Sequence, residues 1–122
     1  MVMDRSEKMG FRVENLFSLE DKVVLITGAG GLGGIYARAF AENGARVILA
    51  SKTLPKALKV RDQLAESGLS CAVHPLDVAD KRQVNRLAAE IEQAYGTIDV
   101  LVHTAALCKL HPVMEDCEEL FR

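Results

Sequence analysis

The sequence predicts an α/β fold in which a parallel sheet is covered by helices on both faces. Short apolar runs rich in β-branched residues alternate with longer amphipathic segments, in the order strand, helix, strand, helix, strand, helix, strand. Such runs are typical of strands that are buried on both faces. Each connection is long enough for a crossover helix, and right-handed crossovers place helices on the two faces of the sheet.

The first strand is expected at 23–26, where four apolar residues follow Lys22. A helix is expected at 35–43. Its apolar side is formed by Ile35, Ala39 and Phe40. Gly44 follows in the position that ends many helices, because glycine readily adopts the left-handed backbone conformation needed there.

The second strand is expected at 45–50, and the next helix opens at Thr53 with Pro55 and ends at Gly68. A partial apolar face on this helix comprises Ala57, Leu58, Leu64 and Ala65. These signals place a second crossover helix before the third strand.

The third strand is expected at 70–76, and the helix after it opens with a capping box of Asp80 and Gln83. The apolar residues of this helix follow a 3.6-residue period: Val84, Leu87, Ala88, Ile91 and Tyr95. Gly96 ends the helix, and the fourth strand is expected at 98–102.

Composition and charge describe an ordinary globular protein. The chain has 122 residues, of which 49% are hydrophobic and 26% charged, so one domain with a single core is expected and intrinsic disorder is excluded. The net charge of −2 gives no reason to expect nucleic acid or an anionic membrane as a partner. The longest uncharged stretch, 23–37, is too short to cross a bilayer.

The N-terminal segment and the cysteines indicate a cytoplasmic protein. Residues 1–16 mix charges without an apolar core, so we expect a tail and no secretory signal ahead of a domain over 17–122. Three cysteines without a CxxC pair indicate reduced thiols rather than a disulfide scaffold. Cys71 lies in an apolar stretch and is expected to be a small buried side chain.

A glycine-rich segment, 27–34, joins the first strand to the first helix. Gly28-x-Gly30-x-x-Gly33 has the spacing of a dinucleotide-binding loop, in which the free N–H groups of a helix N-terminus bind a pyrophosphate. The alternative is a flexible turn, which the flanking strand, helix and second strand disfavour. No Gly-Lys-Ser or Gly-Lys-Thr follows, so the segment is not a Walker loop.

Several motifs in this order make the chain similar to the short-chain dehydrogenase/reductase family. The resemblance covers about residues 16–122 and corresponds to the N-terminal, cofactor-binding half of that family's domain. The motifs that carry it are 19–28, 31–33, 41–45, 76–78, 95–102 and the alanines 105 and 106. The resemblance implies a Rossmann-type doubly wound sheet with strand order 3-2-1-4. It also implies a homo-oligomer that transfers hydride between NAD(P) and a small alcohol or carbonyl substrate.

The resemblance also implies roles for individual residues. Thr27 would brace the glycine loop, and the cofactor phosphates would lie against Gly28, Gly31, Leu32 and Gly33. Asp77 and Val78 would contact the adenine. Ala105 and Ala106 would lie beside the ribose on the nicotinamide side.

Two departures from the family pattern concern the loop and the fourth strand. The loop is one residue shorter between Gly28 and Gly31 than the family's usual Thr-Gly-x-x-x-Gly-x-Gly, and its spacing also resembles the extended, epimerase-type branch. The classical type is favoured by the context of Leu32-Gly33 and of Asp77-Val78. The family's Asn-Asn-Ala-Gly is replaced by residues that can still form hydrogen bonds, His103 and Thr104, followed by two alanines.

The end of the second strand favours NADP, with NAD as the alternative. NAD-binding units place a carboxylate here to accept from the ribose hydroxyls. The chain has Ser51 and Lys52 instead, and its next carboxylate is Asp62, inside the following helix. A hydroxyl and a cation can hold a 2′-phosphate, although Lys52 can also be an ordinary solvated lysine.

The residues that carry catalysis in this family are absent from the 122 residues. The chemistry requires a tyrosine with a lysine four positions later, which lowers the pKa of the tyrosine. Here Tyr36 is followed by Phe40, and Tyr95 by Asp99. We therefore expect an inactive fragment, truncated before the catalytic half. The alternative is a non-catalytic nucleotide-binding module or pseudoenzyme.

Four potential zinc ligands lie within fifteen positions near the end of the chain: His103, Cys108, His111 and Cys117. Their spacing matches none of the usual zinc patterns, and His103 coincides with a family motif position. The sequence therefore predicts no metal site.

Overall fold

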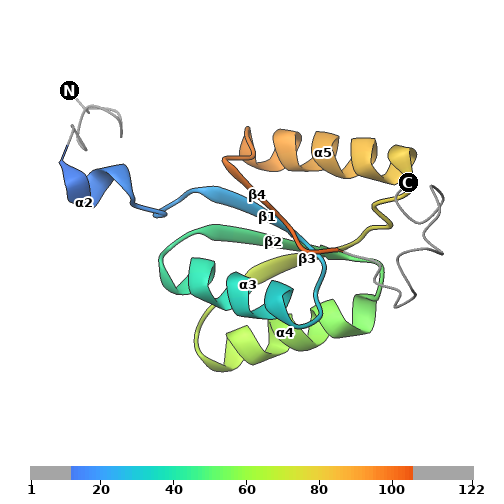
Figure 1. Ribbon diagram of the computed structural model, residues 1–122, viewed down its shortest axis with the longest axis horizontal. Coiled ribbons are helices and arrows are strands. Elements are labelled where there is room, and N and C mark those ends of the chain that lie inside the picture. The colour runs from blue at the N-terminus through green and yellow to red at the C-terminus, as the bar shows by residue number, and fades with distance from the viewer. Residues whose placement is uncertain (1–11, 106–122) are drawn as a thin grey trace, which may run out of the picture.

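The computed structural model describes residues 12–105 (Figure 1). Helices and strands alternate after a short N-terminal helix. Their bounds are α2 Val13–Leu16, β1 Val23–Thr27, α3 Leu32–Glu42, β2 Arg46–Ser51, α4 Leu54–Glu66, β3 Cys71–Pro75, α5 Lys81–Tyr95 and β4 Val100–His103. All seven strands and helices predicted from 23–26 onward are present, so the predicted α/β order is confirmed.

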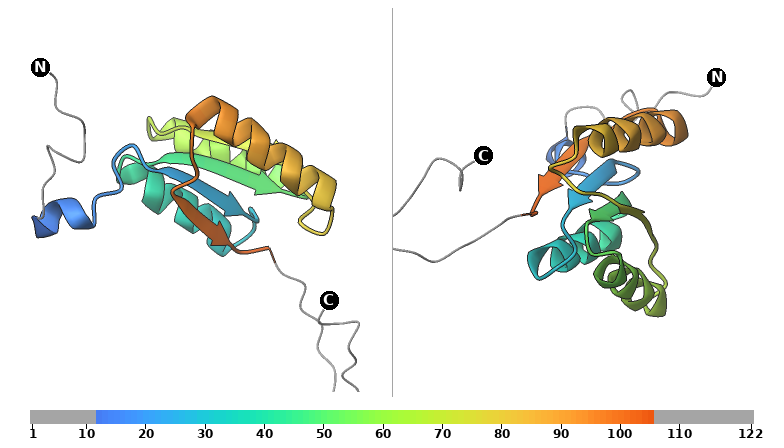
Figure 2. Two further views of the ribbon diagram at one scale, coloured as in Figure 1. Left: turned by 90° about the horizontal axis from the view of Figure 1, so that it is seen from above. Right: turned by 90° about the vertical axis from the view of Figure 1, so that its right-hand side faces the viewer.

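The four strands form one parallel sheet in the order β3-β2-β1-β4, as predicted (Figure 2). β1 lies inside the sheet and pairs with β2 on one side and with β4 on the other. All five residues of β1 are buried, which explains why its sequence is a continuous apolar run. The carboxylate of Asp99 continues this pairing, because its Oδ2 accepts from the N–H of Val23 at 2.8 Å.

Alternate side chains of the strands pack into two cores on opposite faces of the sheet. Val24, Ile26 and Leu49 pack with residues of α3 and α4, including Ala37 and Leu64. On the other face, α5 covers Leu25, Ile48 and their neighbours with Leu87 and Ile91. Figure 2 shows α3 and α4 together on one side of the sheet and α5 on the other. The sheet is thus doubly wound.

The glycines predicted to end the helices and the Asp80 N-cap are confirmed, but the Gln83 side chain has a different partner from the one predicted. Gly44, Gly68 and Gly96 all have positive φ, as the ends of their helices require. The carboxylate of Asp80 accepts from the N–H groups of Arg82 and Gln83, but the Gln83 side chain accepts from Asp77 N rather than from Asp80 N. The capping side chain thereby holds the segment between β3 and α5.

Helix α3 differs from its prediction in both start and orientation. It begins at Leu32, three residues earlier than expected, because Gly33 and Gly34 of the glycine-rich segment lie within the helix. Its buried residues are Gly33 and Ala37, whereas Ile35 is 63% exposed. The prediction that Ile35 and Ala39 face the core is therefore wrong. The side of the helix that packs on the sheet carries the small residues Gly33 and Ala37 instead.

One turn of helix, α2, lies within the segment predicted to be a tail, and the Leu16 N–H donates to the Arg12 carbonyl at 3.1 Å. Its apolar residues Val13 and Leu16 are exposed, and so is Phe17. Of the helices that the structure describes, none is long and apolar enough to cross a membrane.

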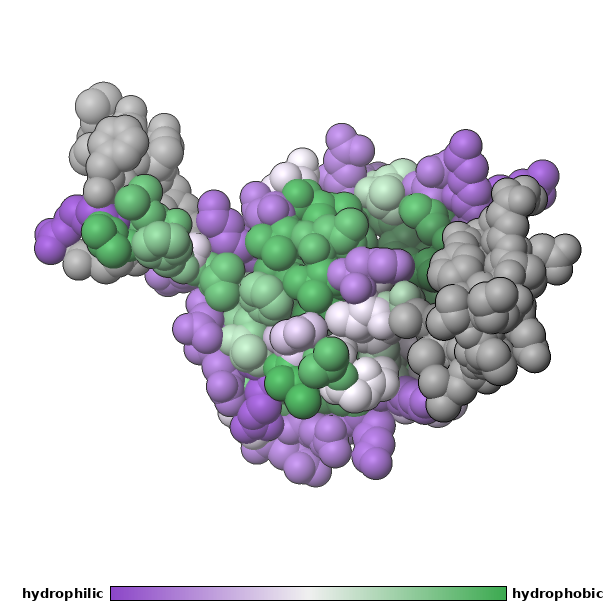
Figure 3. Space-filling model, viewed as in Figure 1, coloured by the Kyte–Doolittle hydropathy of each residue, from purple (hydrophilic) through white to green (hydrophobic). Residues whose placement is uncertain are grey.

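β4 forms the edge of the described sheet and carries exposed apolar side chains. It pairs with β1 but with no other strand among residues 12–105. Leu101 on β4 is 62% exposed, and Leu32 and Ile35 on α3 are 59% and 63% exposed. Hydrophobic side chains gather on this face of the molecule (Figure 3).

Candidate functional site

The predicted site residues meet where the parallel strands end. The glycine loop follows β1, Ser51 ends β2, Asp77 follows β3, and Thr104 follows β4. β2 and β3 extend the sheet on one side of β1, whereas β4 lies on the other side. In open α/β sheets, such a reversal of strand order opens a crevice for ligands at the carboxyl ends.

The loop glycines divide into two groups by what surrounds them. A Cβ built on Gly33 would overlap the carbonyl oxygen of Gly28, and one built on Gly28 would lie 2.5 Å from Thr104 Oγ1. Gly30 and Gly31 have open space. A Cβ built on Gly30 would have Lys56 Nζ as its nearest neighbour, at 3.9 Å, and one built on Gly31 would have nothing within 4 Å. Gly28 and Gly33 therefore close the loop, while Gly30 and Gly31 leave room above it.

The first turn of α3 offers N–H groups to an anion. Its N-cap residue, Gly31, makes no side-chain capping bond, and the first turn contains no acidic residue. The positive end of the helix dipole is therefore not neutralised by the described residues. This arrangement matches a phosphate-binding helix N-terminus.

The end of β4 fixes the position of the loop through hydrogen bonds. Thr104 donates its N–H to the Thr27 carbonyl at 2.8 Å, and its hydroxyl donates to the carbonyls of Thr27 at 2.7 Å and Gly28 at 3.2 Å. Thr27, which is buried, bonds through Oγ1 to Nδ1 of His103 at 2.5 Å. The Thr27 side chain therefore bonds to β4 and not to the loop. The Thr104 side chain, at the end of β4, bonds to the loop directly.

His103 and Thr104 also border a depression beside the loop. Its lining includes Gly30, Leu32 and Tyr36 from the loop and α3. Ala105 follows Thr104 and is half-buried, whereas Ala106 lies outside the described residues. Of the two predicted alanines, only Ala105 can therefore be placed at this end of the site.

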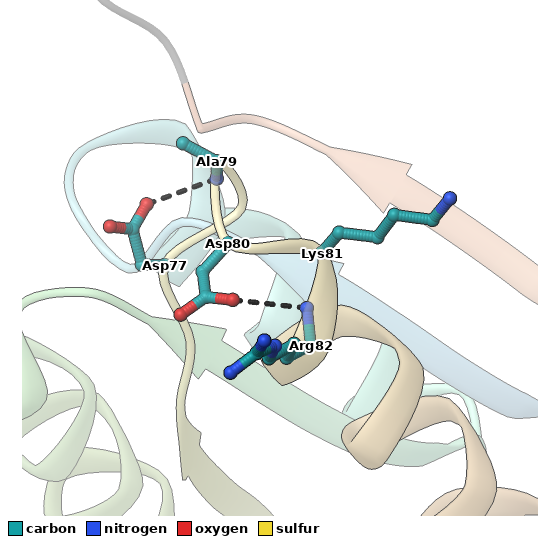
Figure 4. Close-up of a pocket in the computed structure, with 5 residues that line it drawn as sticks. All are labelled: Asp77, Ala79, Asp80, Lys81 and Arg82. Atoms are coloured by element: carbon teal, nitrogen blue, oxygen red, sulfur yellow. Dashed lines mark hydrogen bonds between the residues drawn. The ribbon is translucent and has the colours of Figure 1, made fainter.

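The predicted adenine end is built from β2 and from the turn after β3. Ser51 is buried, and its Oγ accepts from the N–H of Thr53 at 3.1 Å. Asp77 accepts from the N–H of Ala79 through Oδ1 at 3.0 Å, as Figure 4 shows. Val78, beside it, is 41% exposed, so an apolar surface is open to a ligand here.

Lys52 has a carboxylate partner. Its ammonium lies 3.8 Å from Oδ2 of Asp77, and its side chain is 80% exposed. The structure thus pairs two residues that the sequence assigned to separate roles, the 2′-phosphate for Lys52 and the adenine for Asp77.

Sequence reasoning missed two features of this edge. The hydroxyl of Thr104 bonds the loop carbonyls across a separation of 76 residues, which no local pattern reveals. Lys56 places its ammonium near Gly30 from the first turn of α4. Its signal in the sequence is weak, a second lysine four positions after Lys52 at the start of a predicted helix.

Only one of the four potential zinc ligands lies within the residues that the structure describes. His103 lies on β4, whereas Cys108, His111 and Cys117 lie outside the described residues. Between residues 12 and 105, no group of three His, Cys, Asp or Glu side chains could hold a metal ion.

Comparisons with known proteins agree with this architecture. Residues 22–122 match the model of the short chain dehydrogenase family. Sorbitol dehydrogenase from Cereibacter sphaeroides is 39% identical over 104 residues, which are 84% of this chain and 40% of that protein. The 5-keto-D-gluconate 5-reductase of Escherichia coli K12 is 33% identical over 108 residues, 88% of this chain and 42% of the reductase.

Two solved structures are similar over most of the chain. A short-chain type dehydrogenase/reductase from Mycobacterium marinum has a TM-score of 0.79 and 31% identity, with 90% of this chain and 45% of that one covered. L-sorbose reductase from Gluconobacter frateurii, solved with NADPH and L-sorbose, has a TM-score of 0.73 and 27% identity, with 84% and 40% covered.

The chain spans about two fifths of the length of the curated relatives that it matches. Over that span, the family model covers every strand of the sheet and the whole glycine loop. The relatives have an oxidoreductase activity in their names, and the same parallel sheet is found in the solved structures. The chain therefore belongs to the short-chain dehydrogenase family.

Proposed function

We propose that this chain binds a nicotinamide dinucleotide along the carboxyl edge of its sheet, with NADP preferred over NAD. The observation that carries the proposal is the first turn of α3, which lacks a side-chain cap and an acidic residue and lies below the open Gly30 and Gly31. The pyrophosphate would accept hydrogen bonds from these backbone N–H groups. Solved relatives in complex with NADP and NADPH support the choice of cofactor class.

The two halves of the dinucleotide would extend in opposite directions from the loop. The adenosine would lie toward Ser51, Asp77 and Val78, where an exposed apolar side chain adjoins polar ones. The nicotinamide half would lie toward Thr104 and Ala105, at the end of β4. Bound there, the nicotinamide would supply hydride transfer, and the residues of this chain would hold and orient it.

The reaction we propose for the whole protein is the interconversion of an alcohol and a carbonyl compound. Relatives named for sorbitol, 5-keto-D-gluconate and L-sorbose support polyols and keto sugars as the first substrates to assay. The alternative, a nucleotide-binding module without catalysis, has no counterpart among these names. Tyr36 and Tyr95 are not followed by lysine at the fourth position, so we expect no turnover from the 122 residues by themselves.

Binding can be tested by titrating the chain with NADPH and following the fluorescence of the nucleotide. We expect saturable binding that Gly30→Asp weakens by at least about tenfold, because a carboxylate beside the loop repels the phosphates. Gly30→Asn has nearly the same size without the charge and serves as the control. Failure of the unaltered chain to bind NADPH or NADH, or full binding by Gly30→Asp, would contradict the proposal.

Turnover can be measured in the same preparation as oxidation of NADPH in the presence of keto sugars. We expect rates equal to those without protein. A rate above that background which disappears in Gly30→Asp would show that the 122 residues hold a catalytic group other than Tyr36 and Tyr95.

A further inference from the structure

The depression beside the glycine loop combines neutral polar side chains with apolar walls. Its lining comprises residues of the loop, α3 and β4: Gly30, Leu32, Tyr36, Val102, His103 and Thr104. Within residues 12–105, no Asp, Glu, Lys or Arg belongs to this lining. An uncharged ligand with hydroxyl groups on a carbon chain matches such a surface, whereas a phosphorylated or carboxylated ligand would lack a counter-charge in it.

The hydrogen bond between Thr27 and His103 determines which ring nitrogen of His103 carries the proton. Oγ1 of Thr27 lies 2.5 Å from Nδ1 of His103, and Thr27 is 5% exposed. Among the described residues, the Thr27 hydroxyl has no other partner, so it either donates to Nδ1 or leaves its proton buried without an acceptor. A buried donor without an acceptor is costly, which favours donation to Nδ1. The proton of the neutral ring then lies on Nε2.

The Nε2–H group of His103 is left as a donor at the depression. His103 is exposed, and its Nε2 has no hydrogen-bond partner among the described residues. Tyr36 is 37% exposed, and its hydroxyl likewise has no partner in the described part of the chain. Two polar groups from separate elements, α3 and β4, therefore border the same depression and are both available to a ligand.

The depression adjoins the end of β4, toward which the nicotinamide half of the dinucleotide is proposed to lie. Thr104 lines the depression and also bonds the loop carbonyl of Gly28. A substrate has to lie beside the nicotinamide to exchange hydride with it. The volume of the depression is about 410 Å³, which is within the range of sites that bind small molecules. Its position and its size therefore suit a substrate.

We propose that this depression binds the hydroxyl groups of an uncharged, polyhydroxylated substrate, with His103 and Tyr36 as specificity-determining residues. The inference rests on the proposed function, since it places the substrate beside a bound dinucleotide. Nε2–H of His103 would donate to one substrate oxygen, and the Tyr36 hydroxyl would bond a second. Leu32 and Val102 would contact the carbon chain. Thr27 is a positioning residue, because its hydroxyl keeps the proton of His103 on Nε2.

The tautomer is tested by ¹⁵N NMR of the 122-residue chain labelled at histidine, at a pH at which histidine is neutral. We expect His103, identified by the loss of its signals in His103→Asn, to carry its proton on Nε2. Thr27→Val should remove this preference, and Thr27→Ser, which keeps the hydroxyl, should retain it. A proton on Nδ1 in the unaltered chain would overturn the proposal.

Substrate recognition is tested by calorimetric titration of the NADPH-bound chain with D-sorbitol, a pair of reduced compounds that cannot react with each other. We expect saturable binding of D-sorbitol and none of 1-hexanol or D-sorbitol 6-phosphate, which lack the hydroxyls or add a charge. His103→Asn can still accept from Thr27 but lacks Nε2–H, and Tyr36→Phe lacks the hydroxyl. Each should weaken D-sorbitol by about three- to tenfold, and NADPH by less.

Matched controls are His74→Asn on β3 and Tyr95→Phe at the end of α5, since neither residue lines the depression. Both should bind D-sorbitol as the unaltered chain does, and thermal melts check the fold of every variant. Equal losses in His74→Asn and His103→Asn would overturn the inference, because the effect would then not belong to the depression.

The remaining outcomes separate the two proposals. If NADPH binds but D-sorbitol does not, or if D-sorbitol 6-phosphate binds equally well, this inference is wrong and the proposed function stands. If NADPH alone saturates the change at the His103 Nε2 resonance and D-sorbitol adds nothing, the depression belongs to the cofactor and the inference is again wrong. If neither NADPH nor NADH binds the unaltered chain, the proposed function fails and this inference fails with it.

Discussion

The glycine loop and the proposed adenosine end, formed by Ser51, Lys52, Asp77 and Val78, lie along the same edge of the sheet but are held in different ways. The loop is held by backbone and buried groups: Gly33 packs against the Gly28 carbonyl, and the Thr104 hydroxyl bonds the carbonyls of Thr27 and Gly28. The adenosine end is formed largely by charged side chains at the surface, with Lys52 80% exposed beside Asp77. The nitrogen and oxygen of this ion pair are 3.8 Å apart, whereas the Thr104 hydroxyl bonds the loop carbonyls at 2.7 and 3.2 Å.

This difference predicts how substitutions in each region affect folding and binding. A larger side chain at Gly28 or Gly33 shifts backbone atoms that several elements share, so it affects folding as well as binding. A change in an exposed ion pair alters the local charge and leaves the fold intact. The loop should therefore determine that a dinucleotide binds, and the adenosine end should determine which one.

The largest effect is expected at Gly33. In Gly33→Ala, the added methyl group overlaps the carbonyl oxygen of Gly28, so the loop or α3 must move. We expect a loss of about 3 kcal/mol in the free energy of unfolding, measured by urea denaturation, together with loss of NADPH binding. Gly30→Ala has open space and should stay within about 1 kcal/mol of the unaltered chain. Equal stabilities of the two variants would remove the distinction between the two groups of glycines.

A smaller effect is expected from the hydroxyl of Thr104. Thr104→Val keeps the shape of the side chain but removes its bonds to the carbonyls of Thr27 and Gly28. The Thr27 carbonyl keeps the Thr104 N–H as a partner, so the expected loss is about 1 kcal/mol. Thr97→Val, at an exposed position, is the control. A loss no greater than that of the control would show that β4 does not brace the loop through this hydroxyl.

At the adenosine end, the ion pair of Lys52 and Asp77 should contribute less. A double-mutant cycle with Lys52→Gln and Asp77→Asn should give a coupling energy of about 0.5 kcal/mol or less, because Lys52 is exposed and the separation is 3.8 Å. Raising the salt concentration should reduce the coupling further. A coupling as large as the Thr104→Val effect would contradict the contrast between the two ends.

The smallest effect on stability is expected at Cys71, on the outer strand β3. Burial raises the pKa of this thiol, and the charge of Arg61 partly opposes the rise. A thiol whose pKa is raised by folding stabilises the fold at pH below its ordinary value, and this contribution is lost as the pH rises through the folded value. In a chain with Cys108→Ser and Cys117→Ser, alkylation of Cys71 should need a higher pH than alkylation of a free thiol.

Arg61→Gln sharpens this last test. Without the positive charge, the pH profile of alkylation should move further upward. A profile like that of a free thiol in both chains would show that Cys71 is fully open to solvent.

The sequence by itself determined the order of the elements, the parallel sheet, the glycines that end α3, α4 and α5, and the N-cap of α5. These features depend on local signals: continuous apolar runs in the strands, glycines that reach positive φ at Gly44, Gly68 and Gly96, and a carboxylate at Asp80. Each of these residues acts within a few positions of itself, so its effect is encoded in its neighbours along the chain. The strand order followed from the family resemblance.

The tertiary structure alone decided which side chains and glycines meet at the site. Gly28 is constrained because Thr104 approaches it from β4, and Gly30 is free because only the tip of Lys56 lies near it. The exposure of Ile35 was likewise set by how Gly33 lets α3 approach the loop. These contacts join segments far apart in the sequence, and their distances depend on how the helices dock on the sheet, which no local pattern contains.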